Sequence, residues 1–468
     1  MTLTLDDPLL LKGSAFINGE WIDADDSETY PILNPADAEQ IVLMAKCSTT
    51  ETNRAIEAAE KALPAWRKKT AKERSNILRC WFNLIMENQQ DLARILTAEQ
   101  GKPLVESVAE IAYGANFVEW FAEEAKRIYG DVIAPPSDDK RLIIIKQPIG
   151  VVACITPWNF PNAMLTRKIA PALAAGCTVV CKPANETPLS AYALAVLADR
   201  AGVPAGVINI VNGYTSEIGK AMTSHSAVRK LTFTGSTEVG KYLMQACANT
   251  VKRTSMELGG NAPFLLFEDA DLNEAIKGVM TCKLRNAGQT CVSANRFLVH
   301  ESIFDEFSEK ISTILGAQIV GNGGDEEVTV GPLINEAAAQ NIYDLIDDAI
   351  SNGATIISGG GRNKLGECFV NPTVLAGINS NMRIFHEEIF GPVAALTKFS
   401  TEEEAICIAN DTPFGLAAYL YTKDHSRIWR VGEALEYGMV GINESMISNE
   451  MAPFGGIKES GNGREGSK

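Results

Sequence analysis

The chain has 468 residues, of which 46% are hydrophobic and 21% are charged, a composition typical of a globular protein with two or three domains. Its formal net charge of −16 argues against nucleic acid and anionic membranes as partners, because both would repel the protein. The ten cysteines show no repeated metal-binding pairs, and the N-terminus has no apolar core like that of a signal peptide. We therefore expect a cytoplasmic protein with reduced thiols that spans no membrane.

The N-terminal part of the chain is predicted to form a hairpin and then a series of helices. Asn18-Gly19 separates two short strand-like segments, and this dipeptide is a frequent hairpin turn. Apolar residues recur at helical spacing over residues 51–104, and a further helix is predicted over 106–129. Residues 135–139 then form a turn between two β-rich arms. A projecting hairpin exposes a strand edge, which predicts pairing with a partner strand.

From Gly150 onward, strands and helices alternate. Strands are predicted at residues 151–155, 178–182, 207–211 and 230–234, and helices at 162–175, 189–201, 217–224 and 237–248. Such alternation predicts right-handed crossovers and a parallel sheet. The region is thus predicted to be Rossmann-like, with ligands at the carboxyl ends of its strands. A second α/β region is predicted after residue 291, with strands at 295–300 and 354–358 and helices at 304–315 and 336–352.

Two motifs joined by one predicted helix suggest a site. Glu257 precedes Gly259-Gly260, where the missing side chains allow backbone to approach closely. Cys291 follows the bend expected at Gly288, and an amphipathic helix predicted over 272–284 returns the chain between the motifs. A lone cysteine is more often a buried small hydrophobe than a nucleophile, and a lone glutamate is usually solvated. The pattern as a whole, and not either residue alone, predicts a site.

The two motifs together resemble the glutamate and cysteine signatures of the aldehyde dehydrogenase superfamily, and the resemblance runs from about residue 14 to the end. It implies an α/β fold with a Rossmann-like cofactor domain, an α/β catalytic domain and a β oligomerisation arm. The expected boundaries are 14–128 and 147–256 for the cofactor domain and 257–440 for the catalytic domain. Residues 129–146 and 441–468 would form the arm and a C-terminal segment that is short for the family. The implied assembly is a homodimer or a homotetramer.

The resemblance also implies a covalent mechanism. Cys291 would attack the aldehyde, Asn159 of the Pro157–Pro161 motif would stabilise the resulting oxyanion, and Glu257 would activate water to release the acid. Hydride would pass to a nicotinamide cofactor. This chemistry needs no metal, and the four histidines show none of the usual ligand spacings.

The same resemblance implies the cofactor site. Residues 235–240 lie between a predicted strand and a helix, a context that suits a pyrophosphate. Relatives that prefer NAD often carry a glutamate where this chain has Asn185, and a neutral side chain near Lys182 would accept a 2′-phosphate. NADP is therefore expected, and NAD remains the alternative. The expected cofactor-binding residues are Trp158, Lys182, Asn185, Gly235, Ser236, Gly240, Glu388 and Phe390.

Two arginines indicate the substrate. Arg167 and Arg285 match arginines that succinate-semialdehyde dehydrogenases use to hold the distal carboxylate, and Ser448 matches a third contact. Ordinary surface ion pairs are the alternative reading of these arginines. The resemblance predicts oxidation of succinate semialdehyde to succinate, a small-molecule reaction. Glutarate semialdehyde is an alternative, because one extra methylene changes the free energy of binding by only about 1–3 kcal/mol. General aldehydes are another alternative. Acyl transfer to coenzyme A and a catalytically idle binding protein are further alternatives.

Overall fold

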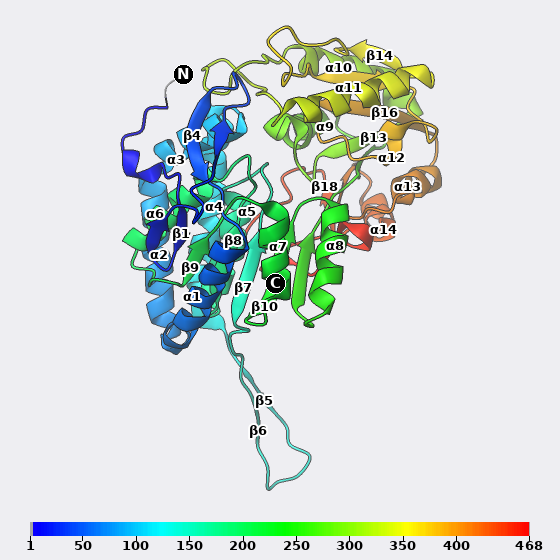
Figure 1. The fold of residues 1–468 in the computed structure, drawn as a ribbon. Coiled ribbons are helices and arrows are strands. Elements are labelled where there is room, and N and C mark those ends of the chain that lie inside the picture. Colours follow the sequence, from blue (N-terminus) through cyan, green and yellow to red (C-terminus); the bar gives the residue numbers. More distant parts are fainter. Residues whose placement is uncertain (1–2, 468) are drawn as a thin grey trace.

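Two β-sheets organise the chain in this computed structural model, which describes residues 3–467 (Figure 1). The first sheet has eight strands, in the order β2 (Glu20–Ile22), β1 (Ala15–Ile17), β9 (Ile208–Ile210), β8 (Thr178–Lys182), β7 (Val151–Ile155), β10 (Val228–Thr234), β11 (Arg253–Glu257) and β20 (Gly461–Asn462). The strands from β9 to β11 are mutually parallel, and the two edges are antiparallel. The predicted parallel, Rossmann-like sheet is confirmed.

The second sheet has seven strands, in the order β14 (Thr355–Ser358), β15 (Thr373–Ala376), β16 (Val393–Phe399), β13 (Ala294–His300), β12 (Ala262–Leu266), β17 (Ala417–Tyr421) and β18 (Met439–Ile442). All neighbouring pairs except β14–β15 are parallel. Helices α9 (Leu272–Val279), α10 (Phe304–Gly316), α11 (Glu336–Ser351), α12 (Arg383–His386), α13 (Glu402–Asn410) and α14 (His425–Ala434) belong to this region. The α/β region predicted after residue 291 is thereby confirmed.

The helices of the first region are α1 (Thr49–Lys68), α2 (Ala71–Glu87), α3 (Gln89–Gln100), α4 (Leu104–Glu124), α5 (Ala163–Ala174), α6 (Leu189–Arg200), α7 (Thr215–Ser224) and α8 (Thr237–Ala248). Capping boxes at Ser48 and Thr70 start α1 and α2 by satisfying their first free amides. Alternate residues of the parallel strands face two separate cores. Val152 and its neighbours on one face pack with α2–α6, and Val151 on the other face packs with α1, α7 and α8.

Two hairpins follow the sequence prediction closely. The turn between β1 and β2 places Asn18 and Gly19 at φ 56° and 81°, the left-handed values that a tight hairpin requires. Strands β5 (Asp131–Ile133) and β6 (Leu142–Ile144) form the second hairpin, which projects far from the rest of the chain (Figure 1). Its apolar residues are exposed, Val132 by 79% and Ile143 by 70%. A third hairpin, β3 (Thr29–Leu33) with β4 (Gln40–Ala45), was not specified by the pattern.

The helix predicted over residues 272–284 is shorter than expected. Helix α9 ends at Val279, and Met280–Leu284 forms a π-helical turn. The apolar spacing does not distinguish the two, because only one residue of the predicted stripe, Leu284, lies in the wider turn. Such turns are rare and frequent at functional sites, and this one directly precedes the segment that carries Cys291.

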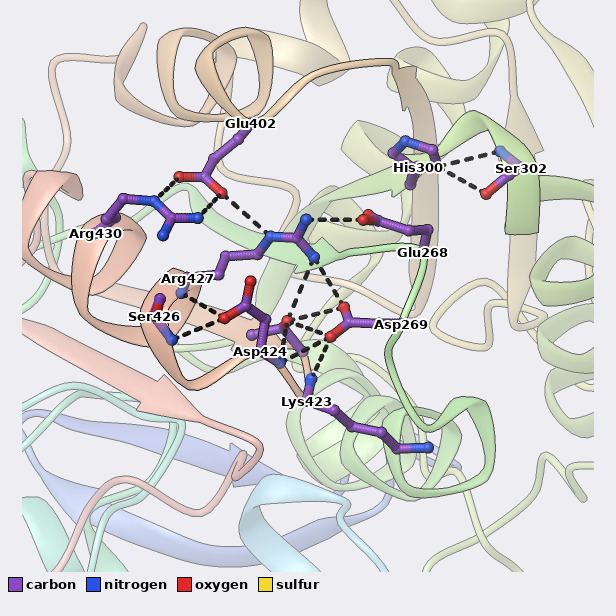
Figure 2. A network of polar contacts seen from close by, with 11 residues as sticks. Glu268, Asp269, His300, Ser302, Glu402, Lys423, Asp424, Ser426, Arg427 and Arg430 are labelled. Carbon is purple, nitrogen blue, oxygen red and sulfur yellow. Dashed lines mark hydrogen bonds and ion pairs between the residues drawn. The ribbon is translucent and has the colours of Figure 1, made fainter.

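An ionic network ties the loop after β12 to α13 and α14 (Figure 2). Arg427 of α14 donates to Glu268 at 2.7 Å, to Asp269 at 2.9 Å and to Glu402 at 3.2 Å. Arg430 binds the same Glu402 through two hydrogen bonds of 2.8 and 2.9 Å. Across residues 3–467, we find no helix with the length and apolarity needed to cross a bilayer.

Candidate active site

A cavity of about 260 Å³ lies where the carboxyl ends of the first sheet meet the second region. Ten residues predicted from the sequence line it: Trp158, Asn159, Arg167, Gly235, Ser236, Arg285, Cys291, Glu388, Phe390 and Ser448. Tyr113, Phe160 and Phe454 also line the cavity, although the sequence pattern did not single them out. Glu257, Lys182, Asn185 and Gly240 were predicted at the site but lie outside this lining.

Cys291 is presented by a strained turn. Asn286 and Ala287 both have φ 53°, and Gly288 has φ 78°, so three successive residues are left-handed. A Cβ on Gly288 would lie 2.2 Å from the carbonyl oxygen of Gly391, so only glycine fits there. Strained backbone of this kind persists where surrounding contacts over-determine it, typically at functional sites.

The Cys291 thiol is only partly exposed. Burial raises its pKa to about 12, and the nearby Glu388 carboxylate contributes to the rise. The thiolate is the nucleophilic form. Attack therefore requires a base that removes the proton, or a new positive charge beside the sulfur.

Asn159 follows β7 in the turn that leads to α5, and its side chain is fixed in orientation. Its Nδ2 donates to the backbone oxygen of Gln289 at 3.0 Å, and its Oδ1 accepts from the amide of Phe160 at 3.1 Å. An amide group has two N–H donors. One donor is engaged by Gln289, so the other is available to an oxygen in the cavity.

Glu257 ends β11, and its carboxylate is buried beside the cavity. Neither carboxylate oxygen has a hydrogen-bond partner among residues 3–467. A Cβ on Gly455 would lie 2.8 Å from Glu257 Oε1, so the carboxylate points toward Gly455 and not into the cavity. Burial and the negative charge of Glu465 raise the pKa of Glu257 to about 8. Both carboxylate oxygens of this buried side chain are thus without a donor among the described residues.

Glu465 is a site residue that sequence reasoning missed. It lies on β21 (Glu465–Gly466), which pairs with β19 (Pro453–Phe454). It accepts from Arg167 Nε at 2.8 Å, from Thr232 at 3.1 Å and from Lys168. Burial alone would raise its pKa, but Lys168 and Arg167 lower it to about 2. The partners are 298 and 297 positions apart, so no local pattern could have shown the pairing.

The three residues predicted to hold an anion gather around Tyr113. The Tyr113 hydroxyl accepts from Arg167 Nη1 at 3.2 Å and hydrogen-bonds Ser448. The Arg285 guanidinium lies 4.7 Å from the centre of the Phe160 ring and 5.6 Å from that of Tyr113. Arg167 is 1% exposed, which excludes the surface ion pair considered for it. Its Nη2 is buried without a hydrogen-bond partner in the described chain, as expected of a donor that faces a ligand.

The residues expected to bind a dinucleotide occupy two places. Phe390 packs edge-to-face on Trp158 with 5.4 Å between ring centres, at one wall of the cavity. Ser236 caps the N-terminus of α8 by accepting from the Val239 amide at 3.4 Å, next to the glycine at 235. A helix N-terminus reached through such a turn fits a pyrophosphate. Glu388 accepts from the Gly260 amide at 3.1 Å, and burial raises its pKa to about 7.

Lys182 and Asn185 lie together at the carboxyl end of β8. Lys182 Nζ donates to Asn185 Oδ1 at 3.0 Å, and Asn185 Nδ2 donates to the Gly213 oxygen at 3.0 Å. Burial lowers the pKa of Lys182 to about 8. Gly240 packs α8 against Leu258, whose Cδ2 would lie 2.4 Å from an added Cβ. Within the described chain, no cluster of three or more His, Cys, Asp or Glu side chains could hold a metal ion.

Comparison with known proteins identifies the class of protein that this fold and site define. The aldehyde dehydrogenase family model matches residues 21–468, and the chain belongs to that family. The family and the fold class predicted from the sequence are thereby confirmed.

Particular relatives are similar over the whole chain. Succinate-semialdehyde dehydrogenase [NADP(+)] GabD of Escherichia coli (strain K12) is 56% identical over 466 residues, which cover 100% of this chain and 97% of the relative. Glutarate-semialdehyde dehydrogenase of Pseudomonas putida is 57% identical, with 100% and 97% covered. 3-Sulfolactaldehyde dehydrogenase of Pseudomonas putida is 55% identical, with 100% and 96% covered. The crystal structure of an E. coli NADP-dependent enzyme matches with a TM-score of 0.98 at 56% identity, covering 99% of this chain and 96% of the other.

Proposed function

We propose that this aldehyde dehydrogenase oxidises succinate semialdehyde to succinate with NADP as the hydride acceptor. The observation that carries the proposal is the unpartnered, buried Nη2 of Arg167 in the same cavity as Cys291, with Arg285 and Ser448 around the same tyrosine. An arginine donor without a partner in the interior is satisfied by an anion. Relatives named for aldehydes that carry a distal carboxylate or sulfonate support this assignment.

The proposed chemistry proceeds on the residues of this chain. Cys291 gives its proton to solvent water and its sulfur bonds to the aldehyde carbon, while the carbonyl electron pair moves to the oxygen and forms an oxyanion that the free N–H of Asn159 stabilises. Trp158, Glu388 and Phe390 would hold a nicotinamide, which when bound supplies the acceptor for the hydride of that carbon, so that the acyl group remains on Cys291 as a thioester. Glu257 takes a proton from water as the water oxygen attacks the thioester, the carbon–sulfur bond breaks to release the acid, and the departing sulfur regains a proton from Glu257. A carboxyl group with a pKa of about 8 suits a base near neutral pH.

The cofactor is proposed to bind along the first sheet. Asn185 is neutral and held by Lys182, so a 2′-phosphate would meet a cation and no carboxylate at this position. We assign residues 14–128 and 147–256 to the cofactor domain and 257–440 to the catalytic domain. The ratio of kcat/KM for NADP and NAD tests the preference, and a strong preference for NAD would contradict it.

Assembly is proposed to use the arm at residues 129–146, whereas the C-terminal segment 441–468 packs partly on its own chain, through β20 in the first sheet and Glu465 beside Arg167. The hairpin of β5 and β6 exposes apolar side chains that a second subunit could cover. We expect a cytoplasmic homodimer or homotetramer. Light scattering of the purified protein gives the oligomeric state, and a monomer at micromolar concentration would contradict the assignment.

The deciding experiment compares succinate semialdehyde with butanal, which lacks the carboxylate. Each charged hydrogen bond contributes about 1.5–3 kcal/mol, so Arg285→Ala should raise KM for succinate semialdehyde by about 10- to 100-fold. KM for butanal should stay unchanged. Arg362→Ala, at an exposed arginine on a distant surface, is the matched control. Equal use of both aldehydes by the wild type would instead indicate a general aldehyde dehydrogenase.

Glutarate semialdehyde is the second candidate, because a relative of that name is as similar as the succinate-semialdehyde enzyme. One methylene changes binding by about 1–3 kcal/mol, so kcat/KM for the two acids should differ by at most about 200-fold. The acid with the higher kcat/KM is the better substrate. Coenzyme A added to the same assay should leave the rate unchanged if water is the acyl acceptor.

A further inference from the structure

Lys102 and Glu110 form an ion pair that the proposed chemistry does not use. Lys102 Nζ lies 2.6 Å from Glu110 Oε2, and the two side chains are 0% and 1% exposed. Removing two charges from water offsets most of their attraction, so such a pair adds little stability relative to apolar residues. The stability of the fold alone therefore does not explain why this buried ion pair is present.

The other contacts of the pair go to the turn that carries Asn159. Lys102 Nζ donates to the Asn159 backbone oxygen at 2.7 Å. Glu110 Oε1 accepts from the amides of Asn162 and Ala163 at 3.0 and 3.3 Å, where α5 begins and its amides lack helical partners. The pair thus holds the turn at the residue whose side chain enters the cavity and at the start of the next helix.

The same turn is joined to the segment that carries the nucleophile. Asn286 Nδ2 donates to the Asn159 oxygen at 2.9 Å, and Asn159 Nδ2 donates to the Gln289 oxygen at 3.0 Å. Glu106 Oε2 accepts from the Asn286 amide at 2.7 Å. Glu106 and Glu110 lie one turn apart on α4, so neighbouring carboxylates of one helix hold both segments.

We propose that Lys102 and Glu110 are positioning residues of the oxyanion site, which set the place of the Asn159 amide relative to Cys291. This inference rests on the proposed function, because it takes Asn159 as the oxyanion donor. Loss of one such donor costs about 10²–10³ in kcat, and misplacement by 1 Å costs about 10². The pair should therefore contribute about 10- to 100-fold to kcat and leave KM for the aldehyde nearly unchanged.

The test is a double-mutant cycle between the pair and Asn159. The variant Lys102→Met/Glu110→Gln removes both charges together and leaves no unpaired ion in the interior. It should lower kcat by about 10- to 100-fold in the wild-type background. In the Asn159→Ala background it should cause no further loss, because the pair acts through that amide. Lys252→Met is the matched control, since this buried lysine donates to the His225 oxygen at 2.7 Å, away from the site, and should leave kcat unchanged.

Circular dichroism and thermal unfolding of each variant give the folded fraction to which kcat is normalised. Suppose that Asn159→Ala lowers kcat, and that Lys102→Met/Glu110→Gln lowers kcat by a further 10- to 100-fold in the Asn159→Ala background. The positioning role is then overturned, and the proposed function is unaffected. If Asn159→Ala leaves kcat unchanged, both the positioning role and the oxyanion role of Asn159 are overturned. Should the double variant fail to fold, Glu110→Asp, which keeps both charges but shortens the link to the Asn162 and Ala163 amides, completes the same cycle with a smaller expected loss.

Discussion

Two charge clusters of this protein have opposite composition. In the surface cluster one arginine, Arg427, is shared by three carboxylates, and its side chain is 14% exposed (Figure 2). In the buried cluster one carboxylate, Glu465, is shared by Arg167 and Lys168, whose side chains are 1% and 0% exposed. The first has an excess of negative charge and the second an excess of positive charge.

The difference in excess charge determines whether each cluster needs a further partner. Water and salt screen the excess of carboxylates at the surface, so the Arg427 cluster needs no further partner. The buried cluster cannot be screened in this way, and Glu257 beside it is mostly protonated below its pKa of about 8, so it adds little negative charge. Its uncompensated cation supports the proposal that the cavity takes an anionic substrate. The variants below each remove one charge from one of the two clusters.

The largest effect is expected for Glu465→Gln. It leaves Arg167 and Lys168 in the interior without their carboxylate, and breaking a buried pair in this way costs about 3–5 kcal/mol. The thermal midpoint should fall by several degrees, and turnover should fall with it. Glu459→Gln is the control, because Glu459 makes an exposed pair with Lys241 in the same C-terminal segment. Equal midpoints for the two variants would contradict the comparison.

The pH dependence of that stability loss follows from the pKa of Glu465. The pKa is lowered from its ordinary value of 4.5 to about 2, so the stabilisation is complete above pH 4.5 and is lost as the pH falls towards 2. The midpoints of wild type and Glu465→Gln should therefore converge on acidification.

The next effect concerns the rate of thioester hydrolysis as a function of pH. Glu257 must be ionised to act as a base, and its pKa is raised to about 8. The rate should rise about tenfold per pH unit below 8 and level off above it. Glu402→Gln in the surface cluster should leave this profile unchanged, whereas Glu465→Gln should shift it to lower pH, since the Glu465 charge helps to raise that pKa. Steady-state rates between pH 6 and 9 check both, and a flat wild-type profile would remove Glu257 from the role of base.

A smaller effect is expected for Arg427→Gln. The change removes the one cation that joins Glu268, Asp269 and Glu402, in a partly screened position. Unfolding free energy should fall by about 1–3 kcal/mol, while kcat and KM stay at the wild-type values. Denaturant titration together with steady-state kinetics measures both. A changed kcat would mean that the surface cluster acts on the site.

The smallest effect is expected for Arg430→Ala. Arg430 and Glu402 form an exposed pair in which the arginine side chain is 54% exposed, and solvent screens most of the attraction in such pairs. The loss should vanish in 1 M salt, where the screening length is about 3 Å. Thermal midpoints at low and high salt test this, and a salt-independent loss would point to packing instead of charge.

Local sequence patterns predicted much of the fold and the candidate catalytic residues. The strands and helices between residues 150 and 248 were predictable because each repeats its own periodicity over a short stretch. Cys291, Asn159 and Glu388 were recognisable because their motifs combine the residue with the turn that presents it, such as the glycine at 288. The wider turn at Met280–Leu284 was missed, because helical spacing of apolar residues does not specify which backbone hydrogen bond is made.

Which charges meet depends on the tertiary fold. Glu465 and Tyr113 reach Arg167 from segments 298 and 54 positions away, and the pairing depends on how β21 and α4 pack on α5. From the sequence we could predict that the thiol of Cys291, the amide of Asn159 and two arginines lie in turns and helices. The structure determined that Glu257 lies beside the cavity instead of lining it, and that one donor of Arg167 is left without a partner. A buried charge must be balanced by the groups that the fold places next to it. The spacing of residues along the chain does not specify which groups those are.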